Sequence, residues 1–167
     1  TSNIISPTHI YNNEGTYTVS VTTNGVNGIS TATRNIIVYA TPTATQPISS
    51  LICDDNNDGF YNFDLTAKTS AILNGQSPTQ YGVRYYANAV DYANTIAITS
   101  PTNFPNTSAY QLQTIIAEVY NLDNSDCKAI TTFDIQVFES PLPSTSVSPI
   151  QLCDNTSFGT DVDGKVV

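Results

Sequence analysis

A dense group of acidic and amide side chains lies in LICDDNNDGFYNFDLT, residues 51–66, and its residue types could do chemistry. Asp54, Asn56 and Asp58 occupy alternate positions, and Gly59 follows where a sharp turn is needed. Short oxygen-bearing side chains at this spacing can converge on one hard cation. The pattern therefore predicts a calcium site. Its candidate ligands are Asp54, Asn56, Asp58, Phe60 through its carbonyl oxygen, Asn62 and Asp64.

A solvated turn is the alternative interpretation of the same residues. Leu65 stands where an EF-hand loop carries its bidentate Glu, so any calcium would need a different closing ligand. Asp and Asn side chains also close turns by accepting hydrogen bonds from the backbone two residues on. Asp64 is well placed to cap a helix that we expect over 65–75. The sequence leaves both interpretations open.

Catalysis is not expected from these carboxylates. Paired acids that hydrolyse glycosides need a cleft and one raised pKa, whereas these acids crowd one short turn. The sequence has no G-x-S-x-G segment, and its one histidine, His9, lies far from the acidic residues along the chain. We therefore expect a protein that is not an enzyme.

Aromatic side chains supply a second class of candidate site. The chain has ten Tyr, and an exposed Tyr can stack on a sugar ring. Carbohydrate binding is therefore the competing functional hypothesis. The tyrosines that we consider for it are Tyr81, Tyr85, Tyr86, Tyr92 and Tyr110. Asn106-Thr107-Ser108 also matches a glycosylation acceptor, a short motif that arises by chance in chains rich in Asn and Thr.

Three cysteines suggest a disulfide framework. Cys53 and Cys127 are both expected at polar strand ends, and we predict a disulfide between them. It would close a loop of about 75 residues and contribute roughly 4 kcal/mol to stability on a loop-entropy model. Two free thiols in a cytosolic domain are the alternative. The sequence does not identify a partner for Cys153.

Composition excludes several classes of partner. The net charge is −9 with only five Lys and Arg, which argues against nucleic acid and against an anionic membrane surface. No apolar run approaches the roughly 20 residues of a membrane-spanning helix. Hydrophobic residues make up 40% of the chain, so a packed core is expected.

Strand patterns and linkers divide the chain into three parts. Alternating apolar and polar residues predict strands, and 65–75 predicts one short helix. The linkers TPTATQP, at 41–47, and SPLPSTSVSP, at 140–149, are extended and semi-rigid by composition. We expect strands at 17–22, 34–39, 48–53, 60–63, 81–87, 95–99, 110–121 and 128–138, with a hairpin turn at Asn24-Gly25 or Asn27-Gly28.

A repeat follows from the cysteines and linkers. Cys53 and Cys153 are 100 residues apart, about one β-sandwich domain, and each comes shortly after a linker and directly before Asp. The predicted fold class is all-β, with tandem immunoglobulin-like sandwiches. The expected domains are half a domain at 1–40, a complete module at 41–147 and the start of a third at 148–167.

Two parts of the chain resemble known families. His9, Tyr11, Gly15, Tyr17, Val19 and Val21 match the C-terminal half of a PKD domain. The pattern L-x-C-D-D-N-x-D-G, then V-x-Y-Y and D-C-x-A-x-T-x-F-x-I-x-V, resembles repeat modules of very large Bacteroidetes cell-surface proteins. In those proteins such modules alternate with PKD-like domains ahead of a region used for type IX secretion.

The resemblance implies a stalk or repeat segment of an exported adhesin linked to gliding motility or surface attachment. Its expected location is extracellular, at the cell surface and associated with the outer membrane. Its expected partners are neighbouring repeat modules and a surface polysaccharide, without direct membrane insertion. Calcium is the cofactor expected from the spacing of the acidic segment. The alternative is a carbohydrate-binding module of a secreted glycan-degrading protein.

Overall fold

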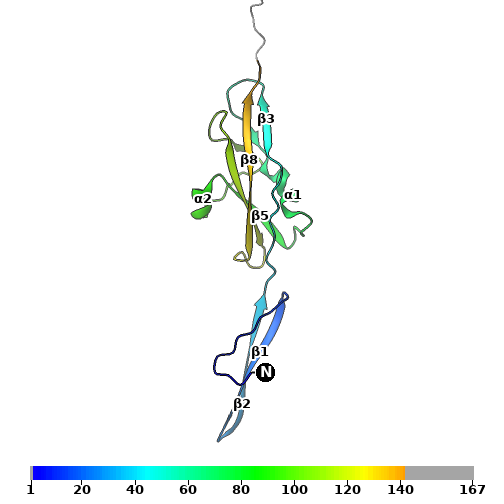
Figure 1. Cartoon of the computed structure of the whole chain (residues 1–167), viewed down its shortest axis with the longest axis vertical. Helices are drawn as coiled ribbons and strands as arrows, with labels where there is room; N and C mark the ends of the chain where they lie inside the picture. Colours follow the sequence, from blue (N-terminus) through cyan, green and yellow to red (C-terminus); the bar gives the residue numbers. More distant parts are fainter. Residues whose placement is uncertain (1, 142–167) are drawn as a thin grey trace, which may run out of the picture.

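A computed structural model describes residues 2–141, so the start of the predicted third module and Cys153 lie outside the described residues. Figure 1 shows a long hairpin followed by a larger β-sheet module, with the connecting segment between them. The hairpin consists of β1 (Gly15–Gly25) and β2 (Gly28–Val38), paired antiparallel. Its turn falls at residues 26–27, because the ladder extends to the pair Gly25 and Gly28. The turn is therefore displaced from both predicted positions.

The hairpin leaves apolar side chains in solvent. Val21 is 61% exposed and Ile29 is 73% exposed, although both lie in regular strands. A strand with alternating apolar residues normally buries one face against a second layer. Within residues 2–40 no second sheet covers this hairpin.

The module is built on a four-stranded sheet in the order β3-β8-β7-β5. The long hairpin predicted near the end of the module is present as β7 and β8. The strands are β3 (Ser50–Asp54), β5 (Tyr81–Tyr86), β7 (Gln113–Asn121) and β8 (Lys128–Glu139). β3 runs parallel to β8, and the other neighbours are antiparallel.

A thinner second layer covers one face of this sheet. It contains a small ladder between β4 (Asn62–Phe63) and β6 (Phe104–Pro105), and a helical segment follows Asp64. That segment consists of η1 (Leu65–Lys68) and α1 (Thr69–Leu73), in the region predicted as helix. A further short helix, α2 (Ala89–Ala93), was not predicted.

The core lies between these two layers. Alternate residues of β7 and β8 face inward, and Ile115, Val119 and Ile135 are each fully buried. Phe63 and Leu65 meet them from the second layer. The period-two pattern thus places its apolar residues in the core, and the predicted all-β sandwich fold is confirmed.

Two predicted strands differ from the structure. Residues 95–99 form no strand, because Thr95 adopts a left-handed φ of 57° and the following segment joins β5 through a single hydrogen bond from Ile98 N to Tyr85 O. β7 starts at Gln113 rather than at 110, because Tyr110 also has a left-handed φ of 59°. Both differences arise from backbone conformations that side-chain periodicity does not report.

The first linker is packed against the module. Thr45 N donates to Ile72 O at 3.0 Å, and Pro42 and Pro47 are buried. The Gln76 amide bonds Thr43 on both sides, accepting from its N–H at 2.9 Å and donating to its carbonyl oxygen at 2.7 Å. The segment is extended, as predicted, but it is held in place by the module that follows it.

The chain enters and leaves the module at opposite ends. Asn121, at the end of β7, donates its side-chain amide to the Ala40 carbonyl oxygen at 3.0 Å, where the linker arrives. β8 starts at this end and runs the length of the sheet to Glu139, where the described chain ends two residues later. We call the end with the β7–β8 turn (residues 121–128) the entry end. The end with residues 54–59, 109–110 and 139–141 is the exit end.

Candidate functional site: the two ends of the module

The acidic segment forms a closed turn at the exit end. Asp54 is 5% exposed, and its carboxylate oxygens accept from Asn56 N at 3.2 Å and from Gly59 N at 2.6 Å. The Asn56 side-chain oxygen accepts from Asp58 N at 3.3 Å, and Asp58 accepts from Phe60 N at 2.8 Å. These are successive Asx turns, so the carboxylates are largely used to order their own backbone.

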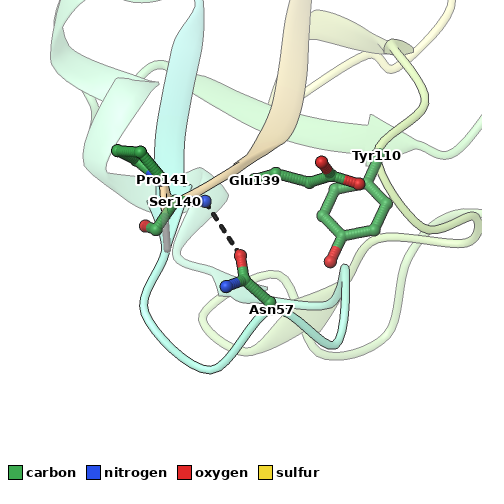
Figure 2. Close-up of a pocket in the computed structure, with 5 residues that line it drawn as sticks. All are labelled: Asn57, Tyr110, Glu139, Ser140 and Pro141. Atoms are coloured by element: carbon green, nitrogen blue, oxygen red, sulfur yellow. Dashed lines mark hydrogen bonds between the residues drawn. The ribbon is translucent and has the colours of Figure 1, made fainter. Parts of the chain in front are cut away.

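Gly59 allows this turn to press against a neighbouring loop. Its φ is 82°, and a Cβ added there would lie 2.4 Å from the Ala109 Cβ. Asn57 also adopts a left-handed φ, of 56°, which Asn tolerates better than most residues. Its side-chain oxygen accepts from Ser140 N at 2.9 Å, which ties the acidic turn to the departing chain (Figure 2).

Asn106 holds the exit end together, a role that the sequence analysis did not predict. Its side chain is buried, accepts from Tyr61 N at 2.8 Å and donates to the carbonyl oxygens of Gly59 and Ser108 at 2.9 Å each. The partners Gly59 and Tyr61 are more than forty residues away along the chain, beyond the reach of a local pattern. The glycosylation motif at 106–108 therefore contains a structural asparagine with no free amide.

The six predicted calcium ligands are divided between several roles. Asp54, Asn56 and Asp58 share the turn, whereas Asn62 belongs to β4 and Asp64 caps η1 by accepting from Thr66 N at 2.9 Å. Across residues 2–141, no three Asp, Glu, His or Cys side chains are grouped as a metal site would require. The six residues are thus divided between the acidic turn, β4 and the cap of η1, and calcium binding stays a prediction.

An open pocket of about 470 Å³ lies where the chain leaves the module. Figure 2 shows its lining residues Asn57, Tyr110, Glu139, Ser140 and Pro141. The pKa of Tyr110 is raised above 10.0, first by desolvation and then by the nearby carboxylates of Asp54 and Glu139. The phenol is protonated at neutral pH, as in an ordinary tyrosine, and the nearby carboxylates disfavour its ionisation further.

The two cysteines of the module lie at opposite ends. Cys53 is exposed on β3, opposite Phe138 near the end of β8. Cys127 is half-buried in the β7–β8 turn, directly before Lys128 at the start of β8. Ten residues of strand between Lys128 and Phe138 span about 33 Å at roughly 3.3 Å per residue.

The predicted disulfide between Cys53 and Cys127 is therefore wrong within this module. A disulfide requires Cα atoms about 4.4–6.8 Å apart. The sequence placed both cysteines at strand ends, which is correct, but it did not specify which ends. The parallel pairing of β3 with β8 carries Cys53 to the end of the sheet away from the β7–β8 turn.

Comparison with known families gives one match. The model of the Flavobacterium inter-domain disulphide bond domain matches residues 49–143, more than half of the chain. The chain belongs to this family. Nothing among the curated proteins or the solved structures matches it. Membership in the inter-domain disulphide bond family indicates an extracellular Bacteroidetes domain, in agreement with the group that the repeat pattern resembles.

The inter-domain disulphide bond domain also has a buried charge cluster that the sequence did not reveal. Glu118 is 1% exposed on the face of the sheet opposite the core. It pairs with Arg84 at 2.7 Å and with Lys128 at 3.0 Å, from the strands on either side. The pKa of Lys128 is raised above 10.5, mainly by its hydrogen bond to Glu118. This cluster ties β5, β7 and β8 together.

The tyrosines considered for sugar binding are mostly buried in this domain. Tyr81, Tyr85 and Tyr86 are 8%, 3% and 2% exposed. Tyr85 is part of the hydrophobic core, and its hydroxyl shares a hydrogen bond with Thr69 Oγ1 at 2.8 Å. Burial leaves these three rings no face on which a sugar could stack.

Among residues 2–141, no helix has the length and apolar character needed to span a membrane.

Proposed function

We propose that this chain is a non-enzymatic stalk segment of an exported cell-surface adhesin, in which neighbouring modules are joined end to end. The observation that carries the proposal is the position of entry and exit at opposite ends of the module, marked by Asn121 with Ala40 and by Glu139. A module of this kind adds its full length to a tandem chain. A module whose termini lie together would add little.

The packed linker supports a load-bearing role. Hydrogen bonds from Thr43 and Thr45 to the module, together with buried Pro42 and Pro47, remove much of the freedom that a polar linker would have. The module therefore starts in a fixed direction relative to the segment before it. Fixed directions between successive modules favour reach over flexibility.

The family description supports covalent joining of modules. It names an inter-domain disulphide bond, and the two cysteines of this module lie at the two ends that neighbouring domains would approach. Disulfides form and persist in oxidising compartments outside the cytoplasm, which favours export. The links to gliding motility, type IX secretion and a PKD-like first domain rest on the sequence resemblance.

The proposed partners are the neighbouring modules of the same protein, with a surface polysaccharide as the adhesive target of the whole. The experiment is an in-frame deletion of residues 41–147 from the exported protein. We expect surface display to persist while attachment to polysaccharide-coated surfaces falls, because the stalk is shorter. Unchanged attachment at equal display would reject the stalk proposal.

Carbohydrate binding by the module itself is the competing proposal, and one observation favours it. Phe60 and Tyr61 are adjacent aromatics that are 52% and 47% exposed. A glycan array with the purified chain separates the two proposals. The stalk predicts no retained glycan. Retention that is lost in a Phe60→Ser, Tyr61→Ser double variant would favour the binding module.

The proposed calcium site at the acidic turn is tested by thermal melting of the full chain with calcium and with chelator. Calcium binding at Asp54, Asn56 and Asp58 predicts a higher midpoint with calcium, since a ligand that binds only the folded state stabilises it. Asp58→Ala should abolish the difference. Equal midpoints in the two buffers would reject the site.

A further inference from the structure

We propose that the module is a mechanical clamp that resists tension along the chain, and that the β1–β2 hairpin before it yields first. The inference rests on the proposed stalk function and specifies how the stalk carries load. It follows from the points at which force enters and leaves each part. Tension reaches the module through the linker at its entry end and through Ser140 at its exit end.

The edge of the module that receives this tension is one long segment, residues 40–54. It runs from the entry end to the exit end, first as the linker and then as β3, whose five residues pair with β8. Because β3 and β8 run in the same direction, opposite pulls at residues 40 and 140 draw the two strands along each other. The five residue pairs are therefore loaded together, and the force is divided among them.

A side-chain hydrogen bond closes each end of this edge. At the entry end, Asn121 Nδ2 donates to the Ala40 carbonyl oxygen at 3.0 Å. At the exit end, Asn57 Oδ1 accepts from Ser140 N at 2.9 Å, which holds the departing chain to the turn after β3 (Figure 2). Peeling of the edge from either end must first break one of these two bonds.

Further contacts hold the linker between the two ends. Gln76 bonds both backbone groups of Thr43, and Thr45 N donates to Ile72 O at 3.0 Å. Ala44 packs against the hydrophobic core. The edge is thus attached to α1 and the turn after it as well as to β8, so tension is spread along its length.

The β1–β2 hairpin receives the same tension in the opposite geometry. Its strands are antiparallel, and the pair of Gly15 with Val38 lies at its open end. The chain enters at residue 14 and leaves at residue 39, so both pulls act on this one pair. Each pair then carries the whole force in turn, and a two-stranded hairpin is marginally stable by itself. The hairpin therefore opens at a lower force and lengthens the chain while the module stays folded.

Single-molecule force spectroscopy on the full chain tests the clamp. Every variant carries Cys53→Ser, Cys127→Ser and Cys153→Ser, so that handles attach only at chosen positions. With handles at the two chain ends, we expect a short extension from the hairpin at low force. A longer one follows at a severalfold higher force, from the roughly 90 residues between the start of β3 and the end of β8 at about 3.5 Å each. A module that opens at or below the force of the hairpin would overturn the proposal.

A second direction of pull separates the clamp from general stability. One handle moves from the C-terminus to Ser125→Cys, in the exposed β7–β8 turn at the entry end. Both pulls then act at the entry end, so the linker peels away one contact at a time. We expect a clearly lower peak force for the module in this direction. Equal peak forces in the two directions would contradict loading along the strands.

Asn57 gives the test at a single residue. Asn57→Gly removes the bond to Ser140 and permits the same left-handed backbone, whereas Asn57→Asp keeps an acceptor at that position. We expect Asn57→Gly to lower the peak force between the chain ends but not from Ser125→Cys, and Asn57→Asp to restore it. No loss, or equal loss in both directions, would overturn the role of Asn57 in the clamp. The stalk is tested separately by deletion of residues 41–147, because attachment is a readout independent of the force at which the module opens.

Discussion

At the scale of single residues, the exit end depends on a few positions that permit close approach. Gly59 contacts the loop at Ala109, Asn106 joins three backbone groups, and Asn57 connects the acidic turn to the departing chain. The side chains of Asn57 and Asn106 pair backbone groups that would otherwise be left unpaired on closing the turn, and Gly59 permits the close approach. The acidic turn is therefore a structural closure of the module end as well as a candidate ion site.

Gly59→Ala should destabilise the full chain by about 2–4 kcal/mol, because it combines a strained positive φ with a steric clash against Ala109. Gly75→Ala is the matched control. Gly75 has a similar φ of 86° but no atom within 4 Å of the added methyl, so about 1 kcal/mol is expected. Urea denaturation measures both, and equal losses would contradict the close approach.

Stability should fall at alkaline pH. Burial raises the pKa of Tyr85 above 10.0, and the hydrogen bond to Glu118 raises the pKa of Lys128 above 10.5. Each group holds its proton more tightly in the folded state, so its contribution is complete below the unfolded pKa and is lost as pH rises through the folded pKa. Urea midpoints from neutral pH to about pH 11 measure the loss. Tyr85→Phe should flatten the decline, and an unchanged slope would contradict the assignment.

At the scale of elements, the alternation of apolar and polar residues predicted the strands that form the core. It failed where the backbone departs from an extended conformation. β7 and β8 follow their alternating pattern because one face is fully buried, as Ile115 and Ile135 show. Residues 95–99 have a similar composition but turn away at Thr95. Predicting whether the two cysteines pair requires the direction of β3 in the sheet. That direction is set by its parallel partner β8, more than seventy residues away along the chain.

The candidate site was only partly predictable for the same reason. Helix capping by Asp64 is local and was predicted, since the side chain acts two residues ahead. The turn-closing role of the acidic residues was one of the two interpretations that the sequence left open. The bridging role of Asn106 and the burial of Glu118 depend on partners in other strands, which no local motif encodes.

The packed linker gives a prediction at this scale. Gln76→Ala removes both hydrogen bonds to Thr43 and should lower stability by about 1–2 kcal/mol, with greater motion between hairpin and module. Gln80→Ala is the control, because the Gln80 amide makes only a long contact of 3.4 Å to exposed Glu14. Urea denaturation and backbone NMR relaxation measure the two effects. Equal behaviour of the two variants would show that the linker is not held by Gln76.

At the scale of the whole molecule, three features place the two junctions of the module at its opposite ends. They are the direction of the chain, the parallel pairing of β3 with β8 and the positions of the cysteines. The chain arrives at one end and departs at the other, and β3 and β8 are parallel neighbours with five residue pairs between them. Tension applied from the linker before β3 and from the end of β8 slides these strands past each other, so the pairs share the load. Such an arrangement suits a segment that transmits force along a stalk.

The central claim is that Cys53 and Cys127 lie at opposite ends of one module. Spin labels on these two thiols, in the full chain with Cys153→Ser, allow the distance between them to be measured by pulsed electron paramagnetic resonance. We predict a main distance of about 33 Å plus the reach of the labels, from ten residues of β-strand. Labels in contact, as expected for Cα atoms about 6 Å apart in a disulfide pair, would contradict the account.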